Sequence, residues 1–242
     1  MQSHLLIDYQ ESLYDVMKRM AEKYPDIMAM VCSGGSGRVD YGALKYFHSF
    51  WPSDNTDPLQ RVFIQWGFGH FFPANTMAAH VTDMGKRPPK FACDVALSGA
   101  FGVDRDVSKM SPEERKTIVA SIALYKNRLR DLVAQGDLYR LESPYEHPRA
   151  ALNYVSVDRT RAVLFIYQLS ESAFGPVKPR GLDPTKRYRV REINLPENAK
   201  SRLNINDQVI DGATLMTDGL SSPLRRAIES AVIEFVEEPG HS

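Results

Sequence analysis

Apolar residues recur once per helical turn between Glu11 and Tyr24, with polar residues between them. This spacing predicts an amphipathic helix over residues 11–24, which Pro25 ends. The next apolar run, Ile27 to Val31, shows no alternation. Such a run is typical of a strand that is covered on both faces, as in a parallel sheet. It leads directly into a loop rich in glycine and serine, residues 32–37.

The same order of elements then repeats. A helical stretch around Tyr41 to Phe47 precedes a short apolar segment, Phe50–Trp51, and another helix is predicted from Pro58 to Phe72. Helices that alternate with buried strands indicate an α/β architecture, for which a (β/α) barrel is one solution. Residues 9–72 supply only about a quarter of a barrel that needs roughly 250 residues.

A further helix is predicted to begin after Ser111, because Ser111 and Glu114 can form a capping box and Pro112 suits the first helical position. Gly136 ends it. Beyond residue 140 the apolar period changes, which predicts an all-β part. We therefore divide the chain into residues 1–140 and 141–242. The strands expected in the second part are residues 151–157, 162–169, 188–193, 208–210 and 231–237.

The net charge, the length of the apolar runs and the spacing of cysteines and histidines argue against several functions. Thirty basic and thirty acidic residues give a net charge of zero, so nothing favours nucleic acid or an anionic membrane surface as a partner. The longest apolar run, Ala162 to Tyr167, is too short to cross a bilayer. Cys32 and Cys93 allow at most one disulfide. Neither cysteines nor histidines have metal-binding spacing, so no metal and no cofactor is expected. The first residues lack a signal-peptide pattern, and localisation is left open.

The glycine loop, Cys32 to Arg38, has three interpretations. It does not fit either common phosphate-binding spacing, which makes a phosphate site the weakest of the three. A tight strand-to-helix turn would explain the glycines by itself. A neutral sugar held by backbone N–H groups is the third interpretation, because glycines let a ligand approach the backbone closely.

Two aspartates follow the segment Phe50–Trp51. Asp57 has a sufficient structural role as the N-cap of a helix whose first residue is Pro58. Asp54 is not needed for that cap. It could form an Asx-turn with the next residues, or it could be a functional carboxylate at the carboxyl end of a barrel strand, where (β/α) barrels hold their active sites.

Several motifs together resemble the C-terminal part of the bacterial α-galactosidases of glycoside hydrolase family 36. The two most specific are Cys-Ser-Gly-Gly-Ser-Gly-Arg at 32–38 and Trp-Pro-Ser-Asp-Asn-Thr-Asp at 51–57. The resemblance implies the C-terminal portion of a (β/α)₈ barrel in residues 1–140 and an antiparallel β-sandwich domain in residues 141–242. Further stretches that carry it are residues 76–81, 96–102, 125–126, 136–141, 178–184 and 188–190.

The resemblance also implies a reaction, the retaining hydrolysis of terminal α-galactosides such as raffinose-type oligosaccharides. Asp54 matches the family's general acid/base, and Cys32 and Gly35 match positions that contact the galactose. Trp51 stands where the family often has tryptophan, and we expect it to bind substrate too. Ser36 stands where glycine is usual, which puts the loop geometry in question.

The family's nucleophile is the aspartate of a Lys-Trp-Asp segment, and this sequence has no such segment. We therefore expect the nucleophile to precede Met1 and the chain alone to be inactive. An alternative is a non-catalytic carbohydrate-binding or partner subunit that completes a barrel from another chain, and a remnant without ligand is a third. The preferred galactoside and a homo-oligomeric state are left open.

Overall fold

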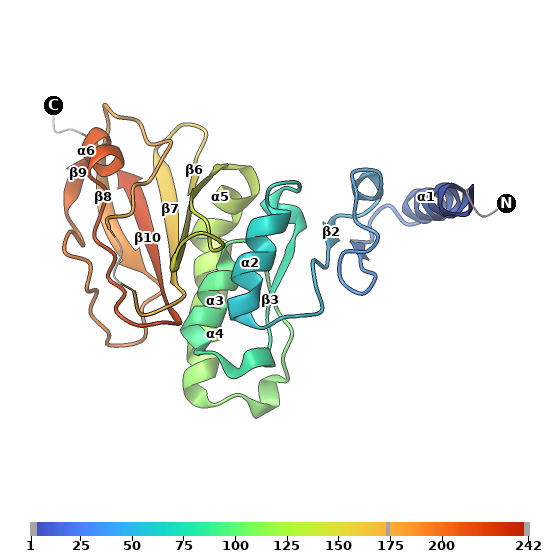
Figure 1. The fold of residues 1–242 in the computed structure, drawn as a ribbon, viewed down its shortest axis with the longest axis horizontal. Helices are drawn as coiled ribbons and strands as arrows, with labels where there is room; N and C mark the ends of the chain where they lie inside the picture. Colours follow the sequence, from blue (N-terminus) through green and yellow to red (C-terminus); the bar gives the residue numbers. More distant parts are fainter. Residues whose placement is uncertain (1–3, 173–174, 240–242) are drawn as a thin grey trace.

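The structure is a computed structural model that describes residues 4–172 and 175–239. Three layers follow one another along its long axis (Figure 1). Helix α1 and the first two strands lie at one end, helices α2 to α5 occupy the middle, and a six-stranded sheet forms the other end.

The N-terminal layer differs in detail from the sequence prediction. Helix α1 covers Leu5–Lys23 and thus begins earlier than expected. Only the last two residues of the predicted strand pair, as β1 (Met30–Val31), whereas Ile27 and Met28 are exposed. The helix expected around residues 41–47 is a single 3-10 turn, η2 (Ala43–Lys45). Apolar character alone overstated the strand, because a strand also needs a hydrogen-bonded neighbour.

The barrel portion continues with two further strands and their helices. β2 (Ser49–Phe50) leads to α2 (Pro58–Phe68), which ends at Phe68 and not at Phe72 as predicted. The sequence prediction missed three elements of this portion, which are β3 (Ala78–Val81), α3 (Pro89–Leu97) and β4 (Ala100–Val103). Short 3-10 turns lie at Ala74–Thr76 (η3), Met84–Lys86 (η4) and Val107–Lys109 (η5).

Parallel pairing orders these strands as in a barrel. β1 pairs in parallel with β2, an isolated parallel bridge joins Phe50 to Met77, and β3 pairs in parallel with β4. Successive strands are therefore spatial neighbours. Because they are parallel, their carboxyl ends and the loops that follow meet at one edge, which is where barrel enzymes place their sites.

The predicted capping box is confirmed. Ser111 accepts a hydrogen bond from the Glu114 amide while the Glu114 carboxylate accepts one from the Ser111 amide, at the start of α4 (Pro112–Leu124). The helical path continues through a π-helical segment, Tyr125–Leu129, into α5 (Arg130–Gln135). Gly136 ends it, as expected.

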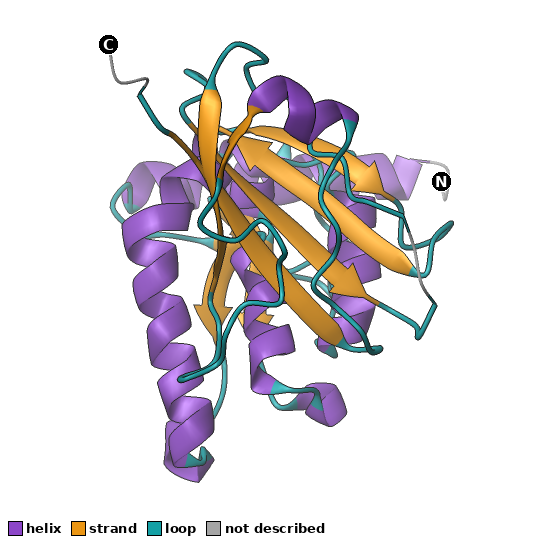
Figure 2. Ribbon diagram, turned by 90° about the vertical axis from the view of Figure 1, so that its left-hand side faces the viewer, coloured by secondary structure: helices purple, strands orange, loops and turns teal. Residues whose placement is uncertain are grey.

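The C-terminal part contains a six-stranded antiparallel sheet, with the order β5-β6-β7-β10-β8-β9 (Figure 2). Every strand predicted there is confirmed within a few residues, and β5 was missed. The elements are β5 (Asp137–Glu142), β6 (Arg149–Val155), β7 (Arg161–Gln168), β8 (Arg187–Ile193), β9 (Val209–Asp211), α6 (Gly212–Thr217) and β10 (Glu229–Glu237).

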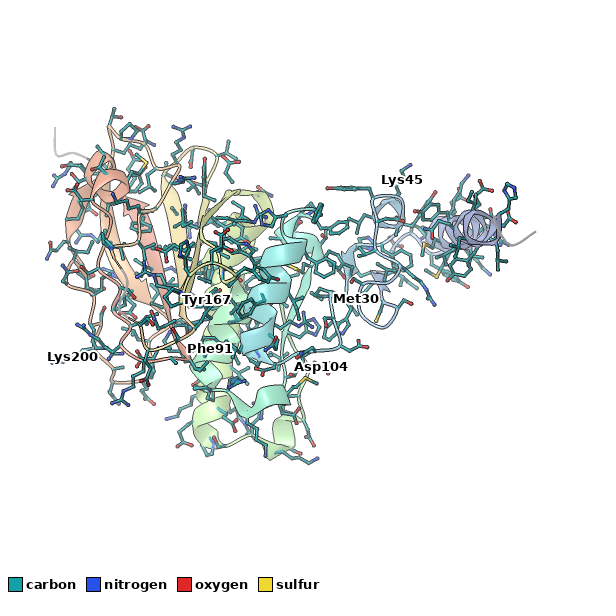
Figure 3. All side chains as sticks on the ribbon, in the orientation of Figure 1. Met30, Lys45, Phe91, Asp104, Tyr167 and Lys200 are labelled. Carbon is teal, nitrogen blue, oxygen red and sulfur yellow. The ribbon has the colours of Figure 1, made fainter. Side chains whose placement is uncertain are left out.

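Both faces of this sheet are buried. On one face Phe91 of α3 packs against Tyr167 of β7, with ring centroids 6.2 Å apart (Figure 3). The other face is covered by irregular segments and α6, and an antiparallel bridge between Val177 and Leu220 belongs to this outer layer. The prediction of the C-terminal portion of a (β/α)₈ barrel followed by an antiparallel β-sandwich domain is confirmed as a barrel portion plus a C-terminal β domain. In the described residues, the second layer of that domain consists of irregular segments and α6 packed on the six-stranded sheet.

Candidate active site

The glycine loop after β1 forms a tight turn. The Ser33 amide donates to the Gly35 carbonyl at 2.9 Å, and the Gly37 amide donates to the Ser33 carbonyl at 3.2 Å. Gly34 and Gly35 have φ values of +54° and +88°, which L side chains rarely adopt. Cys32 is exposed at the start of the turn, and both it and the buried Cys93 are free thiols, so the single disulfide that the sequence allowed is not formed.

This turn touches the loop that carries Asp54. The Trp51 amide donates to the Val31 carbonyl at 3.0 Å, which extends the pairing of β1 and β2 by one residue. Beyond that point, a Cβ atom built on Gly35 would lie 2.9 Å from the Cα of Ser53. The structure therefore brings the two motifs together, backbone against backbone, at the carboxyl edge of the parallel strands.

Asp54 is exposed, and its carboxylate accepts no hydrogen bond from any residue that the structure describes. The Asx-turn expected at Asp54 forms instead at Asn55, whose Oδ1 accepts from the Asp57 amide at 3.2 Å. The Asn55 amide in turn donates to Ser53 Oγ at 3.1 Å. The loop is thus ordered by the neighbours of Asp54, and its own carboxylate remains available to a ligand.

Asp57 is the helix cap that the sequence predicted. Its Oδ1 accepts from the Leu59 amide at 3.0 Å, and Pro58 is the first residue of α2. Arg87 donates two hydrogen bonds to the same carboxylate, at 2.9 and 2.7 Å. These bonds from Arg87 are the main cause that lowers the pKa of Asp57. Asp57 is therefore fully committed to structure.

Trp51 is half-buried between the side chains of Arg61 and His80. The Arg61 guanidinium lies 4.9 Å from the centroid of the indole ring, and the His80 ring packs edge-on at 5.0 Å. His80 stands near the end of β3 opposite Gly102, where any Cβ would approach the imidazole to 2.4 Å. Burial is the main cause that lowers the pKa of His80, and the charge of Asp104, which follows β4, opposes that shift.

Arg61 was not among the candidates that the sequence suggested. It lies on α2 with only 2% of its surface exposed, and burial lowers its pKa to about 10. Sequence reasoning missed Arg61 because an arginine in the first turns of an amphipathic helix is ordinarily solvated. The sequence held a weak signal that Arg61 is buried. Val62 and Trp66 are apolar and lie on the buried face of the same helix, next to Arg61.

Two further searches of the described residues concern metal ligands and membrane-spanning helices. Across residues 4–172 and 175–239, no three histidine, cysteine, aspartate or glutamate side chains are grouped so as to hold a metal ion. In the same ranges, no helix combines the length and the apolar character that a bilayer-spanning segment needs. The candidate site thus combines the Asp54 carboxylate, the Trp51 indole, the His80 imidazole, the buried Arg61 guanidinium and the glycine turn.

These features define the class of protein. Parallel strands in sequential order, with a carboxylate and a glycine turn at their carboxyl edge, form the last portion of a (β/α) barrel, and an antiparallel β domain follows it. Two family models match the chain, Melibiase over residues 2–136 and the glycosyl hydrolase family 36 C-terminal domain over residues 149–235. The chain belongs to glycoside hydrolase family 36.

Relatives with this fold are much longer than this chain. Alpha-galactosidase AgaA of Geobacillus stearothermophilus is 33% identical over 90% of this chain, which spans 29% of that protein. Alpha-galactosidase C of Emericella nidulans is 33% identical over 95% of this chain and 30% of its own length. The crystal structure of AgaB from Geobacillus stearothermophilus matches with a TM-score of 0.82 and 34% identity, over 93% of this chain and 31% of that one.

A further solved structure, AgaA in complex with raffinose, matches 93% of this chain with a TM-score of 0.82 and 32% identity. Another is AgaA in complex with stachyose, at 33% identity. This chain therefore spans just under a third of the relatives that it matches.

Proposed function

We propose that this chain carries the acid/base part of a retaining α-galactosidase site, with Asp54 as the general acid and base. The observation that carries the proposal is the exposed carboxylate of Asp54, without a hydrogen bond to any described residue, beside the Gly35 turn. The family membership and the α-galactosidase relatives support the same reaction.

In this proposal the galactose ring lies over the turn that includes Cys32 and Gly35, with Trp51 at its side. Asp54 donates a proton to the glycosidic oxygen and later takes a proton from the water that releases the sugar. A retaining glycosidase also needs a nucleophilic carboxylate about 5 Å from the acid/base. The family's Lys-Trp-Asp segment would supply it, and that segment is absent from this sequence.

The substrate class is that of α-galactoside oligosaccharides, because solved relatives hold raffinose and stachyose. The indole ring of Trp51 is suited to binding such a sugar, since an indole offers an apolar face and a polar N–H group at its edge.

Hydrolysis of p-nitrophenyl α-galactoside tests the proposal. The chain alone should give no turnover, because one carboxylate cannot form and resolve the glycosyl-enzyme. Co-expression with the preceding portion of AgaA should restore turnover, and Asp54→Asn should remove it while Asp26→Asn, at an exposed position near β1, should not. Robust turnover by the chain alone would contradict the need for a second carboxylate from outside this sequence.

The alternative, a non-catalytic subunit that binds a partner barrel, is favoured by one feature. Much of the N-terminal layer is apolar and exposed, including Leu6 (81%), Met28 (76%) and Ile27 (61%). Apolar patches of this kind mark interaction surfaces. Stable binding to the preceding portion of AgaA without any turnover would support this alternative over the catalytic proposal.

A further inference from the structure

The Arg61 guanidinium is the buried charge around which the candidate site is built. Its Nε donates to the Asn55 carbonyl at 2.9 Å, its Nη2 to the Ser53 carbonyl at 2.8 Å, and its Nη1 to the Ala78 carbonyl at 3.1 Å. Two of these carbonyls belong to the residues on either side of Asp54. The third belongs to the first residue of β3, the next strand of the barrel.

A purely space-filling role does not account for a charge at this position. Within the ranges that the structure describes, no salt bridge joins Arg61 to a carboxylate, although Asp54 attracts it electrostatically. Burying a cation costs free energy, and apolar side chains of similar size often serve stability as well or better. The guanidinium is needed where several acceptors converge, because it offers five N–H donors in a fixed plane.

The same guanidinium also contacts the aromatic wall of the site. It lies 4.9 Å from the centroid of Trp51, which in turn packs against His80. Arg61 therefore holds the backbone on both sides of Asp54, faces the indole beside it and binds the strand that carries His80. No other single side chain described above reaches all three.

We propose that Arg61 is a positioning residue, which fixes the Ser53–Asn55 segment and so aims Asp54 at the sugar held over the glycine turn. The inference rests on the proposed role of Asp54. Its physical basis is that a general acid must stay within hydrogen-bonding reach of the oxygen it protonates, and a misplacement of about 1 Å can reduce the rate roughly a hundredfold.

The test uses the whole chain and needs no turnover. In the wild-type protein, ¹⁵N relaxation should give the amides of Asp54 and Asn55 order parameters near 0.85, as in rigid backbone. Arg61→Lys keeps the positive charge but loses the planar donors. It should lower these order parameters below about 0.6 and shift the indole signal of Trp51, which can be assigned because the chain has only two tryptophans.

Arg149→Lys is the matched control. Arg149 is 1% exposed and donates two hydrogen bonds to Glu142, both at 2.6 Å, in the β domain. This variant should reduce thermal stability yet leave the amides near Asp54 and the Trp51 indole signal unchanged. A role of Arg61 in general stability alone would make the two variants behave alike.

Two outcomes would overturn the proposal. One is a mobile Asp54–Asn55 segment in the wild-type protein, which decides the question even if Arg61→Lys does not fold. The other is a folded Arg61→Lys variant whose segment keeps its wild-type order. Asp54→Asn should leave the relaxation data unchanged, so failure of the proposed acid/base role in the turnover assay is a separate result.

Discussion

Gly35 packs directly on Ser53, so that a Cβ atom on Gly35 would lie only 2.9 Å from the Ser53 Cα. This contact joins the glycine turn to the loop of Asp54. The contact explains why a side chain is excluded at position 35 on grounds of space as well as backbone conformation. Gly34 beside it also has a positive φ, but nothing lies within 4 Å of its Cβ position. The candidate sugar site is thus built by backbone contact between two loops.

We expect Gly35→Ala to destabilise the protein more than Gly34→Ala. Both substitutions meet the unfavourable left-handed backbone, at a cost of roughly 1–2 kcal/mol. Gly35→Ala must in addition displace the Ser53 backbone, and such overpacking adds about 1–3 kcal/mol. Urea unfolding of the two variants measures the difference, and equal losses would mean that the turn and the loop do not touch in solution.

Asp57 should contribute stability through both the helix cap and Arg87. Asp57→Ala removes the cap of α2, which typically costs about 0.5–2 kcal/mol. Asp57→Asn keeps one oxygen for the cap but loses the charge and one of the two acceptors that Arg87 uses. Because its folded pKa is lowered, the carboxylate stabilises the protein above its unfolded pKa, and this contribution is lost as the pH falls through the folded value.

A double-mutant cycle with Arg87→Met, measured by urea unfolding at pH 7 and at acidic pH, isolates the pair. The coupling between Asp57 and Arg87 should be present at pH 7 and should shrink in acid. A coupling that does not change with pH would contradict the assignment of the lowered pKa to Arg87.

His80 should make the fold sensitive to mild acid. Burial lowers its folded pKa below the unfolded value of about 6.5, so protonation favours the unfolded chain. Stability should therefore be full above pH 6.5 and decline as the pH falls below that value toward the folded pKa. His80→Gln should flatten this part of the curve of free energy of unfolding against pH.

The exposed His70 supplies the control for that experiment. His70→Gln should retain the wild-type decline, because it leaves His80 in place. If both variants or neither variant flattens the curve, the decline does not arise from His80.

Asp94 should couple the barrel portion to the β domain. It is fully buried on α3, is paired with Lys90, and accepts hydrogen bonds from Asn194 and from Ser230 Oγ, the latter at 2.7 Å. Asp94→Ala leaves these donors without an acceptor. It should lower the free energy of unfolding by about 3–5 kcal/mol, as for other broken buried ion pairs. Asp131→Ala, on the exposed side of α5, should cause no measurable change in urea unfolding. A loss at Asp94 no larger than at Asp131 would show that the two parts are not held through this carboxylate.

Interactions between residues close in the sequence determined the helix caps and the long strands of this protein. The capping box at Ser111 and Glu114, the cap at Asp57 and the long alternating or apolar runs of the β domain were all readable from the sequence. These caps depend on residues two or three positions apart, and the apolar pattern of a long strand extends over many residues. The two motifs at 32–38 and 51–57 also identified the family, which the comparisons bear out.

The tertiary structure decided what depends on partners far away in the sequence. Strands of two to four residues, such as β1 and β3, exist only because neighbours pair with them. Arg61 can be buried because the carbonyl groups of Ser53 and Ala78, which are far apart in the sequence, accept its hydrogen bonds. His80 packs on Trp51 because the parallel strands meet at one edge. Such contacts leave no period in the sequence, because their free energy arises between segments and not within them.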